Sequence, residues 1–226
     1  MGNHSEKAVI FDLGGIFVWD VWEHMYFDEN GLVKKYNLQK EKAHDVGRSI
    51  YKKYAYNIAY AHADWRTTEI EYWNDFISAF QRELPLNTVA RDFVAITDSF
   101  IHAINEAEMQ KILERLKEKG TKVAICSNQI NFWHERANSK FNFEKFFQPE
   151  RIFLSYKIGK SKSDGFSMFE KAVQSLDVTE ENCTFFDDRE DNVSHAKQYG
   201  INGILVPPDS EETANVINQT LAGLGI

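Results

Sequence analysis

Carboxylates stand directly after apolar runs at two places in this sequence. Asp12 ends the run VIFD, and Asp187 and Asp188 follow the run CTFF much later in the chain. A carboxylate at the end of a buried segment is costly unless a cation or strong hydrogen-bond donors meet it. We therefore expect these carboxylates to share a site with a metal ion or a basic side chain.

Other polar residues occupy comparable positions. Ser127 and Asn128 follow the apolar run KVAIC, and Lys162 lies in the segment IGKSKSD. Taken singly, such residues are more often strand caps, turn residues or solvated side chains. Their order along the chain is more specific than any one of them, and it indicates a single site at the ends of several strands.

Short apolar runs predict the strands that position these residues, because runs of four or five residues between turn signals are typical of buried parallel strands. They are AVIF (8–11), KVAIC (122–126), RIFLS (151–155), CTFF (183–186) and GILV (203–206). Helical patterns follow at 106–119, 164–176 and 192–200, and a last amphipathic helix at the C-terminus. This alternation predicts an α/β fold with a doubly wound parallel sheet, which binds ligands at the carboxyl ends of its strands.

Residues 19–98 differ from the rest of the chain. Strand-like runs nearly vanish, amphipathic stretches such as 89–104 replace them, and tryptophans and tyrosines are concentrated here. We interpret this segment as a helical insertion, with a core domain formed by 1–18 and 99–226. Most of the aromatic rings are expected to form a small core of the insertion itself, and a few to line a pocket that faces the sheet.

The overall composition argues against several classes of partner. With 226 residues and a formal net charge of −8, the chain has no electrostatic reason to bind nucleic acid or an anionic membrane. No apolar run approaches the roughly 18 residues that a membrane span needs, and the N-terminal segment lacks a secretory or myristoylation pattern. Cys126 and Cys183 are expected to be buried free thiols. We therefore expect a cytoplasmic monomer or homodimer.

The motifs VIFDLGGIFV, ICSN, IGKSKSD and FFDDREDN resemble those of the haloacid dehalogenase-like hydrolase superfamily. The resemblance covers nearly the whole chain, and the helical insertion stands where that family has its type 1 cap. The first motif is similar to the FDLGNVIV type of a branch that includes bacterial glucose-1-phosphate phosphatases, and the phosphatase domain of soluble epoxide hydrolase looks related. The resemblance implies a Rossmann-like core with an inserted helical-bundle cap.

The resemblance also implies a Mg²⁺-dependent phosphatase that acts on a small phosphorylated metabolite, such as a sugar phosphate. Asp12 would be the nucleophile, which attacks phosphorus and gives an aspartyl-phosphate that water hydrolyses. Mg²⁺ takes oxygen ligands and uses few carboxylates. Its implied protein ligands are Asp12, Asp188 and the backbone carbonyl of Gly14.

The remaining motif residues have implied roles around the phosphoryl group. Lys162 would neutralise its charge, and Ser127 and Asn128 would bind its oxygens together with neighbouring N–H groups. Asp187 and Asn192 would support this arrangement.

Position 14 departs from the family's pattern. Most phosphatases of this superfamily carry there a second aspartate that protonates the leaving oxygen, whereas this chain has Gly14. General acid–base catalysis is typically worth about a hundred- to ten-thousand-fold. Three outcomes are open: a good leaving group that needs little acid help, a substitute acid such as Asp20 or His24, or slow or absent turnover. The glucose-1-phosphatase-like branch also has glycine at this position, which favours the first outcome.

Two smaller departures concern the backbone. Gly15 replaces the asparagine that is usual in the branch, and Gly14 and Gly15 together are expected to let the chain turn tightly and approach the ion or phosphate. Ser163 replaces the proline that usually follows the lysine, which we expect to loosen that loop.

Two other functions remain open. A 2-haloacid dehalogenase of the same fold attacks carbon without a metal, but a metal-free site has no divalent cation to hold Asp12, Asp187 and Asp188 together. A catalytically silent protein that binds a phosphorylated ligand or a protein partner is compatible with Gly14. A phosphate-ester panel with and without Mg²⁺ separates these alternatives.

Overall fold

The computed structural model describes residues 6–226, so the prediction about an N-terminal signal lies in part outside the described residues. The centre of the molecule is a parallel sheet of five strands in the order β3-β2-β1-β4-β5. The strands are β1 (Ala8–Phe11), β2 (Lys122–Ser127), β3 (Ile152–Leu154), β4 (Cys183–Asp187) and β5 (Asn202–Leu205). Each predicted apolar run forms one of these strands, and no strand end shifts by more than one residue.

The strand register carries the polar residues to one edge of the sheet. Phe11, the last residue of β1, lies opposite Ile125 of β2 and Phe186 of β4. The backbone N–H of Asp12 then donates to the carbonyl of Phe186 at 2.9 Å. Because all the strands are parallel, the residues that follow them meet at this carboxyl edge.

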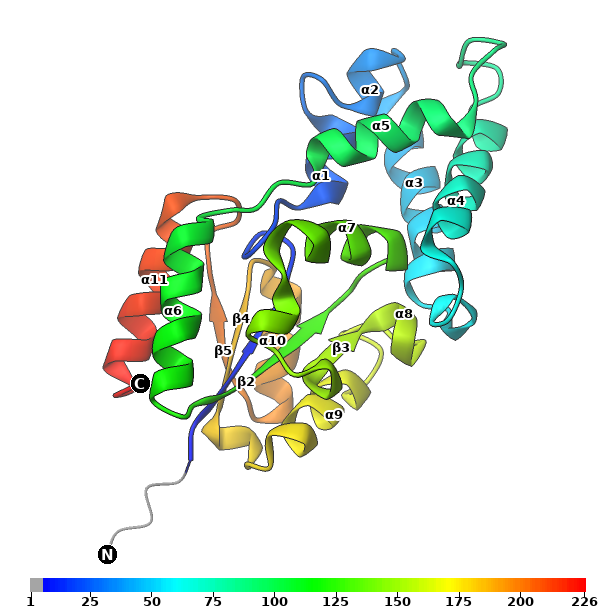
Figure 1. The fold of residues 1–226 in the computed structure, drawn as a ribbon. Helices are drawn as coiled ribbons and strands as arrows, with labels where there is room; N and C mark the ends of the chain where they lie inside the picture. The colour runs from blue at the N-terminus through cyan, green and yellow to red at the C-terminus, as the bar shows by residue number, and fades with distance from the viewer. Residues whose placement is uncertain (1–5) are drawn as a thin grey trace, which may run out of the picture.

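Helices cover both faces of the sheet (Figure 1). Phe11 joins one apolar cluster and Ile10 the other, because successive side chains of a strand point to opposite faces. The first face carries α6 (Glu106–Glu118), α7 (Asn131–Phe141) and α11 (Glu211–Gly223). The second face carries α9 (Ser167–Leu176) and α10 (Glu190–Tyr199). The predicted doubly wound α/β fold is therefore confirmed.

The remaining features of the molecule are two free thiols and several short helical elements. Cys126 and Cys183 are free and buried, as predicted. Within residues 6–226, no helix combines the length and apolar character that crossing a membrane requires. The short elements are α8 (Ser155–Ile158) and 3₁₀ turns at Ile58–Tyr60, Phe143–Lys145, Pro149–Arg151 and Glu180–Asn182.

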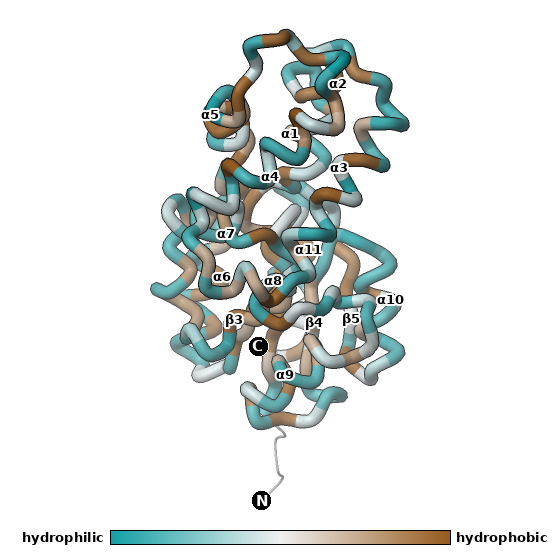
Figure 2. The backbone as a smooth tube through the Cα atoms, turned by 90° about the vertical axis from the view of Figure 1, so that its right-hand side faces the viewer, coloured by the Kyte–Doolittle hydropathy of each residue, from teal (hydrophilic) through white to brown (hydrophobic). Residues whose placement is uncertain are grey.

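The predicted helical insertion lies beyond the carboxyl edge of the sheet (Figure 1). Seen at right angles, it again occupies the end of the molecule opposite α9 (Figure 2). Val18 and Ala103 form an antiparallel bridge where the chain leaves and re-enters the sheet domain. This bridge supports the predicted boundaries of the insertion (19–98), which stay a prediction. Its helices are α1 (Val21–Phe27), α2 (Leu32–Lys35), α3 (Lys40–Ala55), α4 (Trp65–Ala79) and α5 (Ala90–Phe100).

The predicted aromatic core of the insertion is present, but it is continuous with the core of the sheet domain rather than separate from it. Inside the insertion, Trp73 stacks on Phe93 with ring centroids 4.9 Å apart. Tyr72 also contacts Phe132 of α7, with centroids 5.4 Å apart. The buried residues of the insertion and of the first sheet face thus belong to one apolar cluster. The physical reason is that α7 lies between the two parts and presents apolar rings to both.

Buried polar contacts reinforce this junction. Arg136 of α7 donates to Glu69 of α4 at 2.7 Å and to Asp98 of α5 at 3.0 Å. Glu69 is only 2% exposed, so its charge depends on this partner. The three helices are therefore fixed to one another by charge as well as by apolar packing.

A second polar contact ties α1 to the loop after β5. The ring nitrogens of His24 lie 2.8 Å from the Asp28 carboxylate and 2.9 Å from that of Asp209. Only the protonated imidazole can donate to both carboxylates. Burial lowers the pKa of His24, but the hydrogen bonds to Asp28 and Asp209 outweigh it, and the pKa is raised above 6.5.

Replacing His24 tests this contact through the pH dependence of stability. Below about pH 6.5 the imidazole is protonated in both the folded and unfolded states, so its stabilisation is fully present, and it is lost as the pH rises through the raised folded pKa. We expect His24→Gln to lower the free energy of unfolding by about 1 kcal/mol near pH 6 and by less near pH 9. Urea unfolding at both pH values measures the difference, and a deficit that grows with pH would contradict the assignment.

Candidate active site

The Asp12 carboxylate lies at the carboxyl edge of the sheet and has two unlike oxygens. Its side chain is almost fully buried. Oδ2 lies 2.9 Å from the ammonium nitrogen of Lys162. Oδ1 is buried and has no hydrogen-bond partner among residues 6–226. One oxygen is therefore held by a cation, whereas the other remains available to a ligand.

Lys162 is the central cation of the cluster. Its side chain is completely buried, and Nζ lies 2.5 Å from Oδ2 of Asp187 in addition to its contact with Asp12. Burial alone lowers the pKa of Lys162, but the carboxylates of Asp12 and Asp187 outweigh it and raise the pKa above its ordinary value. Lys162 therefore stays charged.

Asp187 is held from several sides and serves to position Lys162. The side-chain amide of Asn192 donates to both carboxylate oxygens at 3.0 Å, and the backbone N–H of Arg189 donates at 2.8 Å. Asp187 and Asn192 are both buried. These donors hold the Asp187 carboxylate in place, and Asp187 in turn holds Lys162. This supports the predicted role of Asp187 and Asn192 as supporting residues.

The loop that carries Lys162 is closed by specific hydrogen bonds. The backbone N–H of Lys162 donates to Oδ1 of Asn128 at 2.9 Å. Asp164 accepts from the N–H of Ser161 at 3.0 Å, and the hydroxyls of Ser161 and Ser163 lie 3.0 Å apart. The helix predicted from residue 164 begins only at Ser167, because this turn uses the residues before it. Ser163 thus takes part in closing the loop where the family has proline.

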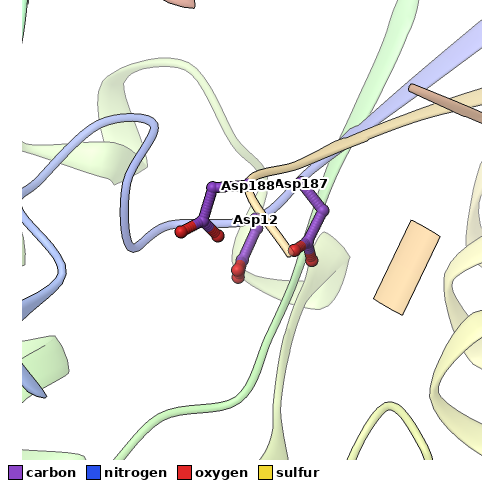
Figure 3. A group of neighbouring side chains, drawn as sticks. All are labelled: Asp12, Asp187 and Asp188. Atoms are coloured by element: carbon purple, nitrogen blue, oxygen red, sulfur yellow. The ribbon is translucent and has the colours of Figure 1, made fainter. Parts of the chain in front are cut away.

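Asp12, Asp187 and Asp188 bring their carboxylates together, each with an oxygen within 4.8 Å of the others (Figure 3). Two like charges about 5 Å apart repel by roughly 3 kcal/mol at an effective dielectric constant of about 20. Burial, with Asp12 and Asp187 adding to it, raises the pKa of Asp188 to about 9. The cluster thus favours a protonated Asp188 unless a further cation balances its charge.

These features fit a divalent cation. The unpartnered Oδ1 of Asp12 and the nearby Asp188 carboxylate are hard oxygen donors, the kind that Mg²⁺ prefers. Asp187 belongs to the same group of carboxylates, but its oxygens already accept from Lys162 and Asn192. The chemistry of the donor set therefore favours Asp12 and Asp188 as ligands and Asp187 as their support.

The two glycines after Asp12 are under different structural constraints. Gly15 has a φ of +71°, and a Cβ there would lie 2.7 Å from the carboxylate carbon of Asp188. Gly14 has no positive φ, and nothing lies within 4 Å of the Cβ position. The predicted tight turn is confirmed at Gly15, but the turn does not require glycine at position 14.

A cavity of about 160 Å³ opens between this cluster and the insertion. Asp12, Gly14, Asn128, Lys162 and Asp188 line it, whereas Ser127 is buried at the end of β2 and does not. As predicted, aromatic rings of the insertion also line the cavity. They are Trp19, Trp22, Tyr51 and Tyr56.

The structure separates the two candidate substitutes for the missing acid. Asp20 lines the cavity, and its Oδ1 accepts from the backbone N–H groups of Trp22 and Glu23 at the start of α1. Burial raises the pKa of Asp20 to about 6. His24 is not among the cavity residues, and both its ring nitrogens are engaged with carboxylates.

Sequence reasoning missed the basic residues of the insertion. Arg48 and Lys52 of α3 line the cavity, as does Arg189 after β4. The four-residue spacing places Arg48 and Lys52 on one helix face. Lysines and arginines on a solvent-exposed helix face show the same spacing, so it does not indicate a binding site. No signal in the sequence states which face of α3 meets the sheet.

Replacing each glycine in turn tests the geometry of the Asp12 loop. We expect Gly15→Ala to lower the free energy of unfolding by about 1–3 kcal/mol, because it strains the backbone and displaces Asp188. Gly14→Ala is the matched control and should change stability by no more than about 0.5 kcal/mol. Mg²⁺ should also raise the melting temperature less in Gly15→Ala than in the unchanged protein. Equal stability of the two variants would show that the close approach to Asp188 is wrong.

Comparisons with known proteins agree with this architecture. A family model described as haloacid dehalogenase-like hydrolase matches residues 9–206. Phosphatase MT3486 of Mycobacterium tuberculosis is 29% identical over 153 residues, which cover 67% of this chain and 69% of that protein.

Solved structures show the same fold at low identity. A HAD family enzyme of Bacteroides thetaiotaomicron superposes with a TM-score of 0.68 at 16% identity, over 92% of this chain and 96% of that chain. A complex of that enzyme with magnesium and inorganic phosphate gives 0.62 at 17% identity, over 91% and 96%. An L-2-haloacid dehalogenase gives 0.60 at 16% identity, over 96% and 99%. Together with the match to residues 9–206, which spans most of the sequence, they place the chain in the haloacid dehalogenase-like hydrolase family.

Proposed function

We propose that this hydrolase is a Mg²⁺-dependent phosphatase that acts on a small phosphorylated metabolite, such as a sugar phosphate. The observation that carries the proposal is the Asp12 carboxylate, which has one oxygen held by Lys162 and the other buried without a partner. The name of the mycobacterial relative supports this function, and the Bacteroides enzyme, which has the same fold, has been solved with magnesium and inorganic phosphate. The expectation of a cytoplasmic monomer or homodimer with no nucleic-acid or membrane partner stays a prediction.

Asp12, Asp188 and the backbone carbonyl of Gly14 are the residues that would hold Mg²⁺. When bound, the ion would supply positive charge that offsets the carboxylates and the phosphoryl group. Lys162 has three N–H donors, of which Asp12 and Asp187 take two. We assign the third, together with Asn128, to the phosphoryl oxygens, whereas Ser127 does not line the cavity and is not assigned a contact with them.

The reaction proceeds in two displacements. A carboxylate oxygen of Asp12 forms a bond to phosphorus while the bond from phosphorus to the leaving oxygen breaks, and that oxygen takes up a proton. Water then attacks the phosphorus of the aspartyl-phosphate, which releases inorganic phosphate and restores the Asp12 carboxylate. Both steps need a group that transfers protons, and Gly14 has no side chain to do so.

We assign this proton transfer to Asp20. It lines the same cavity as Asp12, and hydrogen bonds to the start of α1 fix its Oδ1 and leave Oδ2 for the substrate. A carboxyl group with a pKa of about 6 can donate and accept protons near neutral pH. Asp20 therefore offers the chemistry that the family's usual second aspartate would supply from position 14.

A metal-free dehalogenase is less compatible with the site. Its nucleophile would have to work beside Asp188, whose charge Lys162 does not contact. The likeness to dehalogenase structures shows the fold alone, because identity to the L-2-haloacid dehalogenase is 16%. Assays of phosphate-ester hydrolysis and of halide release, each with and without Mg²⁺, decide between the two activities.

Hydrolysis of a phosphate-ester panel tests the proposed function. We expect turnover that needs Mg²⁺ and that falls about a thousandfold or more in Asp12→Asn, because the amide is not a nucleophile. A 2-haloacid assayed with and without Mg²⁺ serves as the comparison. Hydrolysis that survives in Asp12→Asn, or halide release without metal, would overturn the proposal. Ligand-induced thermal stabilisation without any turnover would identify a silent binding protein instead.

Leaving-group dependence tests Asp20. Asparagine also caps helices, so Asp20→Asn should keep the start of α1 intact. We expect it to lower kcat/KM, which reports the first displacement alone, about 10²- to 10⁴-fold for an alkyl phosphate and far less for p-nitrophenyl phosphate, whose leaving group needs no proton. Adding Gly14→Asp, for which the space is open, should restore part of the alkyl phosphate activity. Equal losses on both esters would show that Asp20 has a structural role only.

A further inference from the structure

One face of α3 directs basic side chains at the candidate active site. His44, Arg48 and Lys52 follow one another at intervals of four residues and line the cavity opposite the carboxylates. Residues four apart share a helix face, and like charges at this spacing destabilise a helix. The protein therefore keeps Arg48 and Lys52 together in spite of a local cost.

These two cations form no ion pair in the part of the chain that the structure describes, although the charge of Lys52 helps to lower the pKa of the Asp164 carboxyl. Arg48 and Lys52 are exposed to the cavity side and form no ion pair or side-chain hydrogen bond among residues 6–226. Lys53, the next residue, is different, because its ammonium lies 2.5 Å from the carboxylate of Asp75 in α4. Lys53 therefore differs from Arg48 and Lys52 in having an acidic partner at ion-pair distance.

The placement of α3 brings this charge over the loop of Lys162. The helix contacts α8, the element that leads into that loop. Tyr56, Arg48, Lys162 and Arg189 line the same cavity. Burial raises the pKa of Tyr56 and the charge of Asp164 adds to this, whereas the charges of the three cations lower it. A ligand in the cavity therefore meets positive charge from both α3 and the sheet domain.

Aromatic rings and a few acids make up much of the remaining wall. The ring centroid of Tyr51 lies 5.9 Å from that of Trp22 and 5.6 Å from that of Trp133. Glu23 and Asp191 also line the cavity, but Asp191 already pairs with Arg189 at 3.2 Å. Aromatic rings thus line the same cavity as the carboxylate cluster and the basic pair.

We propose that Arg48 and Lys52 form a subsite for a second anionic group of the substrate. The substrate class is a phosphate monoester whose leaving group carries a carboxylate or a further phosphate on a scaffold that packs against the rings of Tyr51 and Trp133. This proposal rests on the proposed phosphatase function and narrows it, because a neutral sugar phosphate would leave the basic pair without a partner.

Matched substrates test the subsite. The probes are 4-carboxyphenyl phosphate and 4-carbamoylphenyl phosphate, which have nearly the same shape and differ in one charge. Benzene-1,4-diyl bisphosphate distinguishes a second phosphate from a carboxylate. The readout is the ratio of kcat/KM for each anionic probe to that for the neutral amide, which cancels changes common to all the substrates.

We expect the unchanged protein to prefer an anionic probe, and Arg48→Gln and Lys52→Gln each to reduce that ratio by about fivefold, mainly through KM. Lys53→Gln is the matched control on the same helix and should leave the ratio unchanged. Added salt should weaken the preference of the unchanged protein, because the subsite is open to solvent. The bisphosphate and carboxylate ratios show which anion the pair binds better.

Two results would overturn the subsite: equal effects of Arg48→Gln and Lys53→Gln, or no preference for either anionic probe in the unchanged protein. Calorimetric binding of the same probes to Asp12→Asn keeps this outcome separate from failure of the phosphatase function. If no probe is hydrolysed but binding still prefers the anionic probes and depends on Arg48, the subsite stands and the phosphatase proposal fails. If binding shows no such preference, the subsite is wrong.

Discussion

One buried ammonium group makes the rest of the site possible. Lys162 is completely enclosed and contacts the carboxylates of Asp12 and Asp187. An unpaired buried charge of either sign would be strongly destabilising, so these groups can be buried only together. Their mutual neutralisation leaves the free oxygen of Asp12 and the carboxylate of Asp188 as the negative groups that a divalent cation can balance. The site thus combines a fixed internal cation with room for an exchangeable one.

The continuity of the apolar core determines how the insertion meets this site. Helix α7 contacts the sheet on one side and α4 on the other, so buried rings run without a break from β1 into the insertion. The pairs that Arg136 forms with Glu69 and Asp98 add charged contacts across the same junction. The helix α3 is therefore held over the carboxyl edge by packing that extends far from the cavity, and this defines where its basic face lies.

The first motif has Gly14 where most phosphatases of the family have a second aspartate, and the structure shows how the two glycines of this turn differ. The turn after Asp12 needs glycine at position 15, where a side chain would collide with Asp188, but leaves open space at position 14. Sequence reasoning treated the two glycines alike because a residue type carries no record of its φ angle or its neighbours. The same limit applies to Asp20 and His24: both are near in sequence, but only Asp20 lines the cavity.

The sequence by itself determined where the five strands lie along the chain and which polar residues follow them. Apolar runs of four or five residues specify buried strands, and the polar residues after them, such as Asp12 and Asp187, need no distant information to be noticed. Only the tertiary structure decided which face of α3 meets the sheet, that the insertion shares one core with it, and that Arg48 and Lys52 form no ion pair among residues 6–226. The physical reason is that strand burial is encoded locally, whereas the orientation of a helix and the pairing of its charges depend on packing between residues far apart in the chain.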